Sequence, residues 1–188
     1  AALMKKDCEI GCVAGELESY DLAFFQVAFG DVGKVRRYPV GTLAVYVVVN
    51  PKNPVKRLTV AQLGGIFRGQ IADWGDLPGG TRGKPIGLHT PVLAGTAAAV
   101  FRRTAMHGGE WAPALKDYSK TPLRQQLTDA AVLGEVARDT EAIGFILYDP
   151  LLEAEKTTKV LPIATDMRSD PVPPTSENIF EGRYPLQQ

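Results

Sequence analysis

The chain has 188 residues, of which 45% are hydrophobic and 22% charged, and its 21 basic and 21 acidic side chains give a formal net charge of zero. This balance is typical of a globular protein, and the length allows one domain or two small ones. The neutral charge removes the simplest basis for binding nucleic acid or an anionic membrane surface. The longest apolar stretch, residues 43–49, is far shorter than the roughly 20 residues that span a bilayer. No basic segment followed by an apolar run opens the chain, so we expect no secretion signal in it.

The first two predicted elements are a helix and a buried strand. The helix begins near Ser19, a suitable N-cap, runs to about Phe29 and ends at Gly30. Residues 43–49 are continuously apolar and rich in β-branched side chains, and Asn50 with the following proline ends the run. Such a run is typical of a strand covered on both faces, as in an α/β sheet.

The next helix has the clearest local signal in the chain. Thr59 and Gln62 have the spacing of a capping box, and Leu58 and Leu63 are placed to form a hydrophobic staple. We therefore predict a helix that begins after Thr59 and ends at Gly69.

The rest of the chain continues the alternation of helices and strands. In chain order we predict a loop at 76–83, a strand at 84–89, a turn at 90–95, a helix at 96–106, a helix at 127–137, a strand at 143–148, a strand at 160–163 and a short helix between Thr175 and Gly182. Helices separated by buried strands indicate an α/β fold.

Catalytic patterns are absent from the sequence. No serine lies in a Gly-x-Ser-x-Gly elbow. The stretch 78–85 is no phosphate-binding loop, because Pro78 replaces its first glycine and Pro85 its hydroxyl residue. His107, beside two glycines, is interpreted as a helix-end residue. We therefore predict no catalytic residue, no bound metal and no cofactor.

The two cysteines, Cys8 and Cys12, do not indicate a disulfide. In an extended segment their α-carbons lie about 13 Å apart, which is too far for a bond. A helical turn would allow a strained bridge, and neither histidine is near enough in sequence to suggest a zinc site. The favoured interpretation is two small apolar residues.

One segment has a physical basis for binding. The predicted strand, turn and helix at 84–106 place free backbone N–H groups at a helix N-terminus, where Gly95 lets a ligand approach and Thr96 adds a hydroxyl. Such a site suits a carboxylate or a tetrahedral oxyanion. The alternative, that Thr96 only caps its own helix, is equally consistent with the residues.

Several motifs together resemble one family. They are Val48-Val49-Asn50-Pro51-Lys52-Asn53-Pro54-Val55, Leu58-Thr59 through Gln62-Leu63, residues 66–74, Ala142-Ile143-Gly144-Phe145, and residues 177–186. In this order they resemble the phosphate-binding proteins of ABC transporters. The run 50–74 is the most specific, and the resemblance covers about residues 8–186.

The resemblance implies a two-lobed periplasmic-binding-protein fold of the second type. Residues 1–49 would form part of the first lobe and a crossover strand, residues 50–148 the second lobe, and residues 149–188 the return to the first lobe. Family members usually carry about sixty more residues at the N-terminus, so we expect an incomplete first lobe. Either the sequence is a fragment or lacks some residues of the chain, or another chain completes this lobe. An open sheet edge that nothing fills would invite pairing.

The binding positions implied by the resemblance are altered. The family's Ser-Gly-Thr at the second-lobe helix is Ala94-Gly95-Thr96 here, Thr90 stands in place of its arginine, and Val92 replaces its aspartate. In the first lobe, the hydroxyls of its serine-bearing loop are replaced by Val13 and Ala14. Gly95 and Thr96 carry over as ligand-binding positions, with Thr90 and Ala94 beside them. Each lost charged hydrogen bond costs roughly 1.5–3 kcal/mol, so we expect no tight phosphate binding.

The leading hypothesis is a solute-binding protein that captures a small anion or polar solute between two lobes. The resemblance implies a membrane permease as its partner and a periplasmic or extracellular location. One alternative is a binding or scaffold module that keeps the fold but has lost the phosphate site. The other, an enzyme, has no nucleophile–base pair to support it.

Overall fold

The computed structural model describes residues 5, 8–11, 19–116, 125–149 and 154–188. It divides into two units, one of residues 1–42 with Gln188 and one of residues 43–187. Each unit is described by itself.

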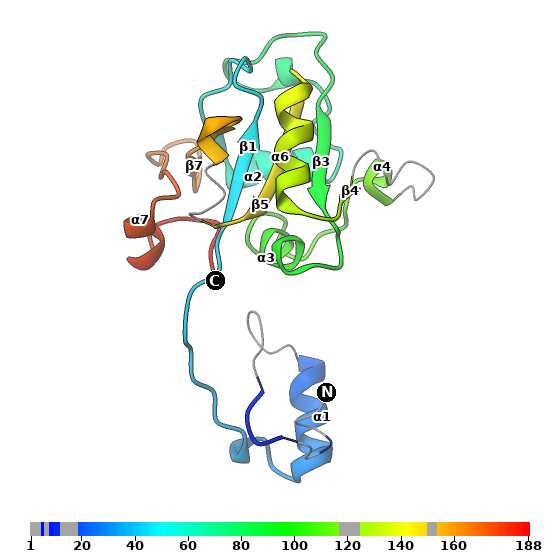
Figure 1. Cartoon of the computed structure of the whole chain (residues 1–188), viewed down its shortest axis with the longest axis vertical. Coiled ribbons are helices and arrows are strands. Elements are labelled where there is room, and N and C mark those ends of the chain that lie inside the picture. The colour runs from blue at the N-terminus through cyan, green and yellow to red at the C-terminus, as the bar shows by residue number, and fades with distance from the viewer. Residues whose placement is uncertain (1–4, 6–7, 12–18, 117–124, 150–153) are drawn as a thin grey trace. The chain divides into compact units, whose positions relative to one another are not determined.

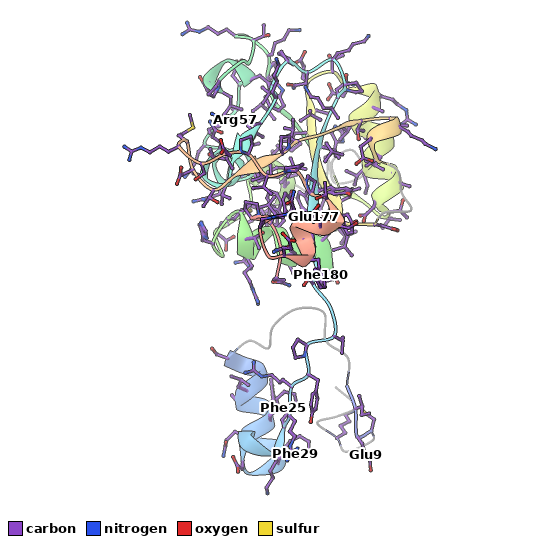
Figure 2. All side chains as sticks on the ribbon, turned by 90° about the vertical axis from the view of Figure 1, so that its left-hand side faces the viewer. Glu9, Phe25, Phe29, Arg57, Glu177 and Phe180 are labelled. Atoms are coloured by element: carbon purple, nitrogen blue, oxygen red, sulfur yellow. The ribbon has the colours of Figure 1, made fainter. Side chains whose placement is uncertain are left out.

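The first unit contains helix α1 (Ser19–Phe29) and the short 3₁₀ helix η2 (Val32–Lys34). The predicted helix is confirmed, although Ser19 lies inside its first turn instead of before it. Phe25 and Phe29 lie one turn apart with ring centroids 6.2 Å apart (Figure 2), and Gly30 follows with φ of 72°. Cys8 is half-buried, whereas Cys12, Val13 and Ala14 lie outside the described residues.

The second unit is built on a five-stranded sheet. Its strands are β1 (Val45–Val49), β3 (Gly87–Pro91), β4 (Gln125–Gln126), β5 (Ala142–Leu147) and β6 (Lys159–Val160). Their order is β4-β3-β5-β1-β6. Strand β3 runs parallel to β4 and β5, whereas β1 runs antiparallel to β5 and β6. Strands β2 (Leu58–Thr59) and β7 (Ile163–Ala164) form a separate parallel pair.

Helices cover both faces of the five-stranded sheet. Helix α6 lies on one face, and α2 and α3 lie on the other (Figure 1). The helical segments of this unit are α2 (Val60–Phe67), η3 (Trp74–Asp76), α3 (Thr96–Thr104), α4 (Pro113–Lys116), α6 (Asp129–Arg138), η4 (Ala154–Lys156) and α7 (Ser176–Phe180).

The larger core lies beneath α2 and α3. Its centre is a group of aromatic rings in which Phe101 stacks on Phe145 with centroids 4.2 Å apart, and Phe67 meets both rings edge-on. Under α6, Gly144 has no room for a side chain, because a Cβ there would lie 2.7 Å from the His89 carbonyl oxygen. This glycine lets α6 pack closely against β5.

The capping box that opens α2 is confirmed. The Gln62 amide donates to Thr59 Oγ1 at 3.1 Å, and the Thr59 amide donates to Gln62 Oε1 at 2.8 Å. Helix α2 ends near Gly69, whose φ is 78°. The last helix is confirmed as well, with Thr175 as its N-cap and Gly182 beyond its end at φ of 73°.

Two strand predictions are corrected. The strand predicted at 84–89 begins only at Gly87 and continues to Pro91, because β4 extends the sheet beside Thr90 and Pro91. The strand predicted at 160–163 is two strands in different sheets, β6 and β7. Between them the Leu161 amide donates to Val47 and Pro162 has no N–H, so the chain leaves one sheet there and joins the other.

Candidate functional site

The predicted binding residues lie at one edge of the five-stranded sheet. Strands β3, β4 and β5 are parallel, so their carboxyl ends share this edge, the usual place for ligands in open α/β sheets. Strand β3 ends at Pro91, and the chain turns through residues 92–95 into α3.

Helix α3 begins without a side-chain cap. Its N-cap is Gly95, in an extended conformation at φ −88° and ψ 168°, and no side chain accepts a hydrogen bond from the first turn. The first helical bond is donated by the Ala99 amide to the Gly95 carbonyl at 3.0 Å. The amides of Thr96, Ala97 and Ala98 precede it, so they point out of the helix end with the positive end of its dipole.

The turn before α3 is held in place by β4. The Gln125 side chain accepts from the Leu93 amide at 3.3 Å and donates to the Leu115 carbonyl at 2.7 Å. The Gly95 amide closes the turn by donating to the Val92 carbonyl at 2.9 Å. These bonds fix the start of α3 in the absence of a ligand.

Thr90 brings a buried hydroxyl to this end of β3. The residue is 0% exposed, and its Oγ1 has no hydrogen-bond partner among the described residues. Side chains alternate along a strand, so Thr90 shares a face with Leu88, which packs in the core beneath α2 and α3. The hydroxyl therefore faces the layer of α3, and leaving it unpaired there costs free energy.

Apolar side chains border the start of α3. Val92 is 37% exposed and Leu127 is 90% exposed. Pro91 pairs with Gln126 in the parallel β3–β4 register, and Val92 and Leu127 are the residues that follow this pair. The segment 90–99 contains no charged side chain.

Two ionisable groups lie on the face of the sheet that α6 covers, opposite α3. His89 is on the opposite face from Thr90, with Nε2 at 3.7 Å from Asp139 Oδ2. At the carboxyl end of β5, Asp129 accepts a hydrogen bond from the Leu147 amide at 3.1 Å. Burial raises the pKa of Asp129. The site at α3 thus relies on backbone amides and a hydroxyl, with no cation in the segment 90–99 that forms it.

Ala94, Gly95 and Thr96 lie together at the start of α3, and their role in binding stays a prediction. Thr90, predicted to begin the turn, is a buried residue of β3. Thr96 is the first helical residue rather than the cap, so its hydroxyl does not cap the helix. Leu127 and Gln125 were not predicted, because parallel pairing between distant segments leaves no local signal in the sequence.

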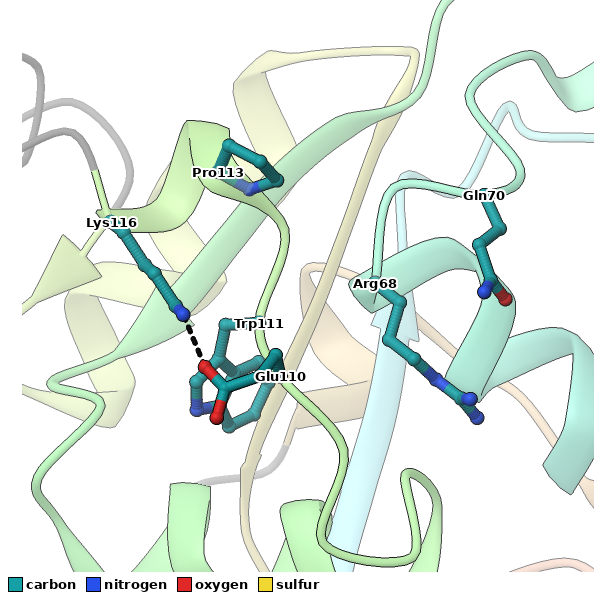
Figure 3. A pocket seen from close by; sticks show the side chains of 6 residues that line it. All are labelled: Arg68, Gln70, Glu110, Trp111, Pro113 and Lys116. Atoms are coloured by element: carbon teal, nitrogen blue, oxygen red, sulfur yellow. Dashed lines mark hydrogen bonds and ion pairs between the residues drawn. The ribbon is translucent and has the colours of Figure 1, made fainter.

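Two hollows lie away from these residues. The first, of about 550 Å³, is lined by Arg68, Gln70, Glu110, Trp111, Pro113 and Lys116 (Figure 3). Its Glu110 carboxylate pairs with Lys116, which holds the pKa of Glu110 below its usual range. The second, of about 460 Å³, lies between α2, the end of α3 and residues 182–187 and includes His107. None of the predicted site residues lines either hollow.

The described residues contain no group of three or more metal-ligating side chains. Among the same residues, no helix has the length and apolar character needed to cross a membrane.

A sequence model described as a PBP superfamily domain matches residues 1–188. The chain belongs to this superfamily. It is 23% identical over 197 residues to the phosphate-binding protein PstS of Pseudomonas aeruginosa, with 100% of this chain and 57% of the relative covered. A solved ABC-type phosphate transport receptor from Vibrio cholerae is 25% identical, with a TM-score of 0.62 over 80% of this chain and 56% of the receptor. A possible phosphate-binding protein from Planctomyces limnophilus is 19% identical, with a TM-score of 0.71 over 100% of this chain and 64% of that protein.

These comparisons confirm the family resemblance and the fold prediction. The chain is a mixed α/β protein that matches part of PstS-type structures, and it spans between 56% and 64% of the length of these three relatives. The family is one of binding and transport receptors without enzymatic activity, so the prediction that the chain is not an enzyme is also confirmed.

Proposed function

We propose that this chain is a solute-binding protein that captures a small anion at the N-terminus of helix α3. The observation that carries the proposal is the uncapped start of α3 together with the buried, unpartnered Thr90 hydroxyl. Free amides at a helix N-terminus bind anions, and a ligand oxygen would also give the Thr90 hydroxyl its missing partner.

The proposed ligand differs from a tightly held phosphate. The relatives named above are described as phosphate-binding, but segment 90–99 contains no cationic side chain in this chain. Without a cationic side chain to pair with it, phosphate should bind more weakly than micromolar. The family resemblance supports four further proposals. The ligand would be captured between two lobes, and a membrane permease would be the partner. A further chain would complete the first lobe, and the protein would be periplasmic or extracellular. The lobe boundaries at 49 and 148 stay a prediction.

Isothermal titration of the purified chain with phosphate, sulfate and acetate tests the proposal. Gly95→Asp places a carboxylate at the N-cap of α3, where it occupies the free amides and repels an anion. Gly95→Asn is the matched control, since it has the same shape without the charge. Both variants share the crowding of a Cβ that would lie 3.1 Å from the Val92 carbonyl oxygen.

We expect at least one anion to bind the parent chain and Gly95→Asp to weaken that binding at least tenfold more than Gly95→Asn. Equal affinities for the two variants would place the anion elsewhere. A flat titration of the parent with all three anions would overturn the proposal.

A further inference from the structure

We propose that the ligand at α3 is an organic monoanion, a carboxylate with a short apolar tail, and that Val92 and Leu127 contact the tail. This inference rests on the proposed function, because it specifies the ligand of the same site. It is carried by the side-chain composition around the start of α3.

The polar part of the site matches a carboxylate in number and kind of donors. The three free amides of the first turn of α3 are donors, and the unpartnered Thr90 hydroxyl lies in β3, on the face of the sheet that α3 covers. Together they would be enough for the two oxygens of one carboxylate. A carboxylate at neutral pH has no proton to donate and carries a single charge, which one helix N-terminus stabilises.

Inorganic phosphate needs binding groups that these residues do not supply. At neutral pH it is a mixture of the monoanion and the dianion, and each form has at least one P–OH group that needs an acceptor. Segment 90–99 offers no cation to balance the second charge of the dianion and no carboxylate to accept the proton. The side chain that points out of the turn between β3 and α3 at position 92 is valine, which is 37% exposed.

The apolar part of the site is exposed and adjacent. Leu127 is 90% exposed although it directly follows β4, and it comes after Gln126, which pairs with Pro91, the residue before Val92. With Ala94 also exposed in the turn, the rim of the site is made of hydrocarbon. An inorganic ion gains nothing from such a rim, whereas a tail that covers it gains about fourfold in affinity for each buried methylene.

The experiment compares three anions by isothermal titration at pH 7: acetate, 3-methylbutanoate and inorganic phosphate. Each is titrated into the parent chain, Leu127→Ser and Met167→Ser. Met167 is the control because it is also exposed, at 57%, but lies in the loop after β7, outside the five-stranded sheet. Neither substitution removes a buried contact, so both variants should fold.

We expect 3-methylbutanoate to bind the parent at least tenfold more tightly than acetate and more tightly than phosphate. Leu127→Ser should remove most of that advantage, whereas Met167→Ser should leave the affinities for all three anions as in the parent. Equal affinities for acetate and 3-methylbutanoate, or tighter binding of phosphate, would overturn this inference and leave the proposed function standing. Failure of every anion to bind would overturn both.

Discussion

Replacing Thr90 with valine should stabilise the chain, which is unusual for a change at a fully buried position. Thr90 is 0% exposed and its hydroxyl has no partner among the described residues. Valine has nearly the same shape, so the packing stays filled. A buried unpaired hydroxyl costs about 1–3 kcal/mol, and its removal should recover roughly 1–2 kcal/mol of that. For a chain of this size each kcal/mol raises Tm by about 2–4 °C.

Urea unfolding followed by tryptophan fluorescence measures this change. Trp74 and Trp111 are the chain's two tryptophans, and both lie in the second unit with Thr90. Thr158→Val is the matched control: Thr158 is 3% exposed, and its hydroxyl donates to the Ala154 carbonyl at 2.7 Å. The free energy of unfolding of the control should fall by about 1 kcal/mol.

If Thr90→Val raises the free energy of unfolding and Thr158→Val lowers it, the result would support an unpaired hydroxyl at position 90. If Thr90→Val loses as much stability as Thr158→Val, the hydroxyl has a hydrogen-bond partner such as a buried water, and the argument for a ligand there fails. In the ligand-binding assay the same variant should weaken anion binding about tenfold or more, because a hydrogen bond to a charged group is lost.

Two further substitutions test the framework around the site. Thr59→Ala removes the capping box of α2 and should lower the free energy of unfolding by about 1–2 kcal/mol in urea titrations; an unchanged midpoint would contradict the cap's role. Gly144→Ala places a Cβ 2.7 Å from the His89 carbonyl oxygen and 2.9 Å from Val132 Cγ1, so it should cost about 1–3 kcal/mol, and a thermal midpoint equal to the parent's would show that α6 can move away.

The sequence predicts the elements best where the signal is local. The bounds of α1, the capping box at Thr59 and Gln62, and the glycine that follows each of α1 and α7 all depend on residues within a few positions of one another. Such features follow from backbone geometry and short hydrogen bonds. They can therefore be predicted from the sequence without knowledge of the fold.

The site was less predictable because its parts meet only through the sheet. From the sequence Thr90 is predicted to lie in a turn, and only its pairing with β4 shows that it belongs to a strand. Leu127 is 35 residues from Val92 in the chain, so no local pattern connects the two. The split between β6 and β7 likewise depends on Leu161 bonding to β1 while Ile163 joins β2. The places of these residues depend on pairing between distant strands, which a single sequence does not indicate.

The start of α3 contrasts with that of three other helices of its unit. Helices α2, α6 and α7 each begin after a threonine whose hydroxyl accepts from the first turn, at Thr59, Thr128 and Thr175. Helix α3 begins at Gly95 without such a bond, which costs a few tenths of a kcal/mol. The unpaired Thr90 hydroxyl adds a larger cost at the same end of β3. In the proposed function, a bound oxygen atom would offset both costs, since it would accept from the free amides and from the hydroxyl. A ligand without acceptor oxygens would offset neither, so the proposed site would favour an oxyanion.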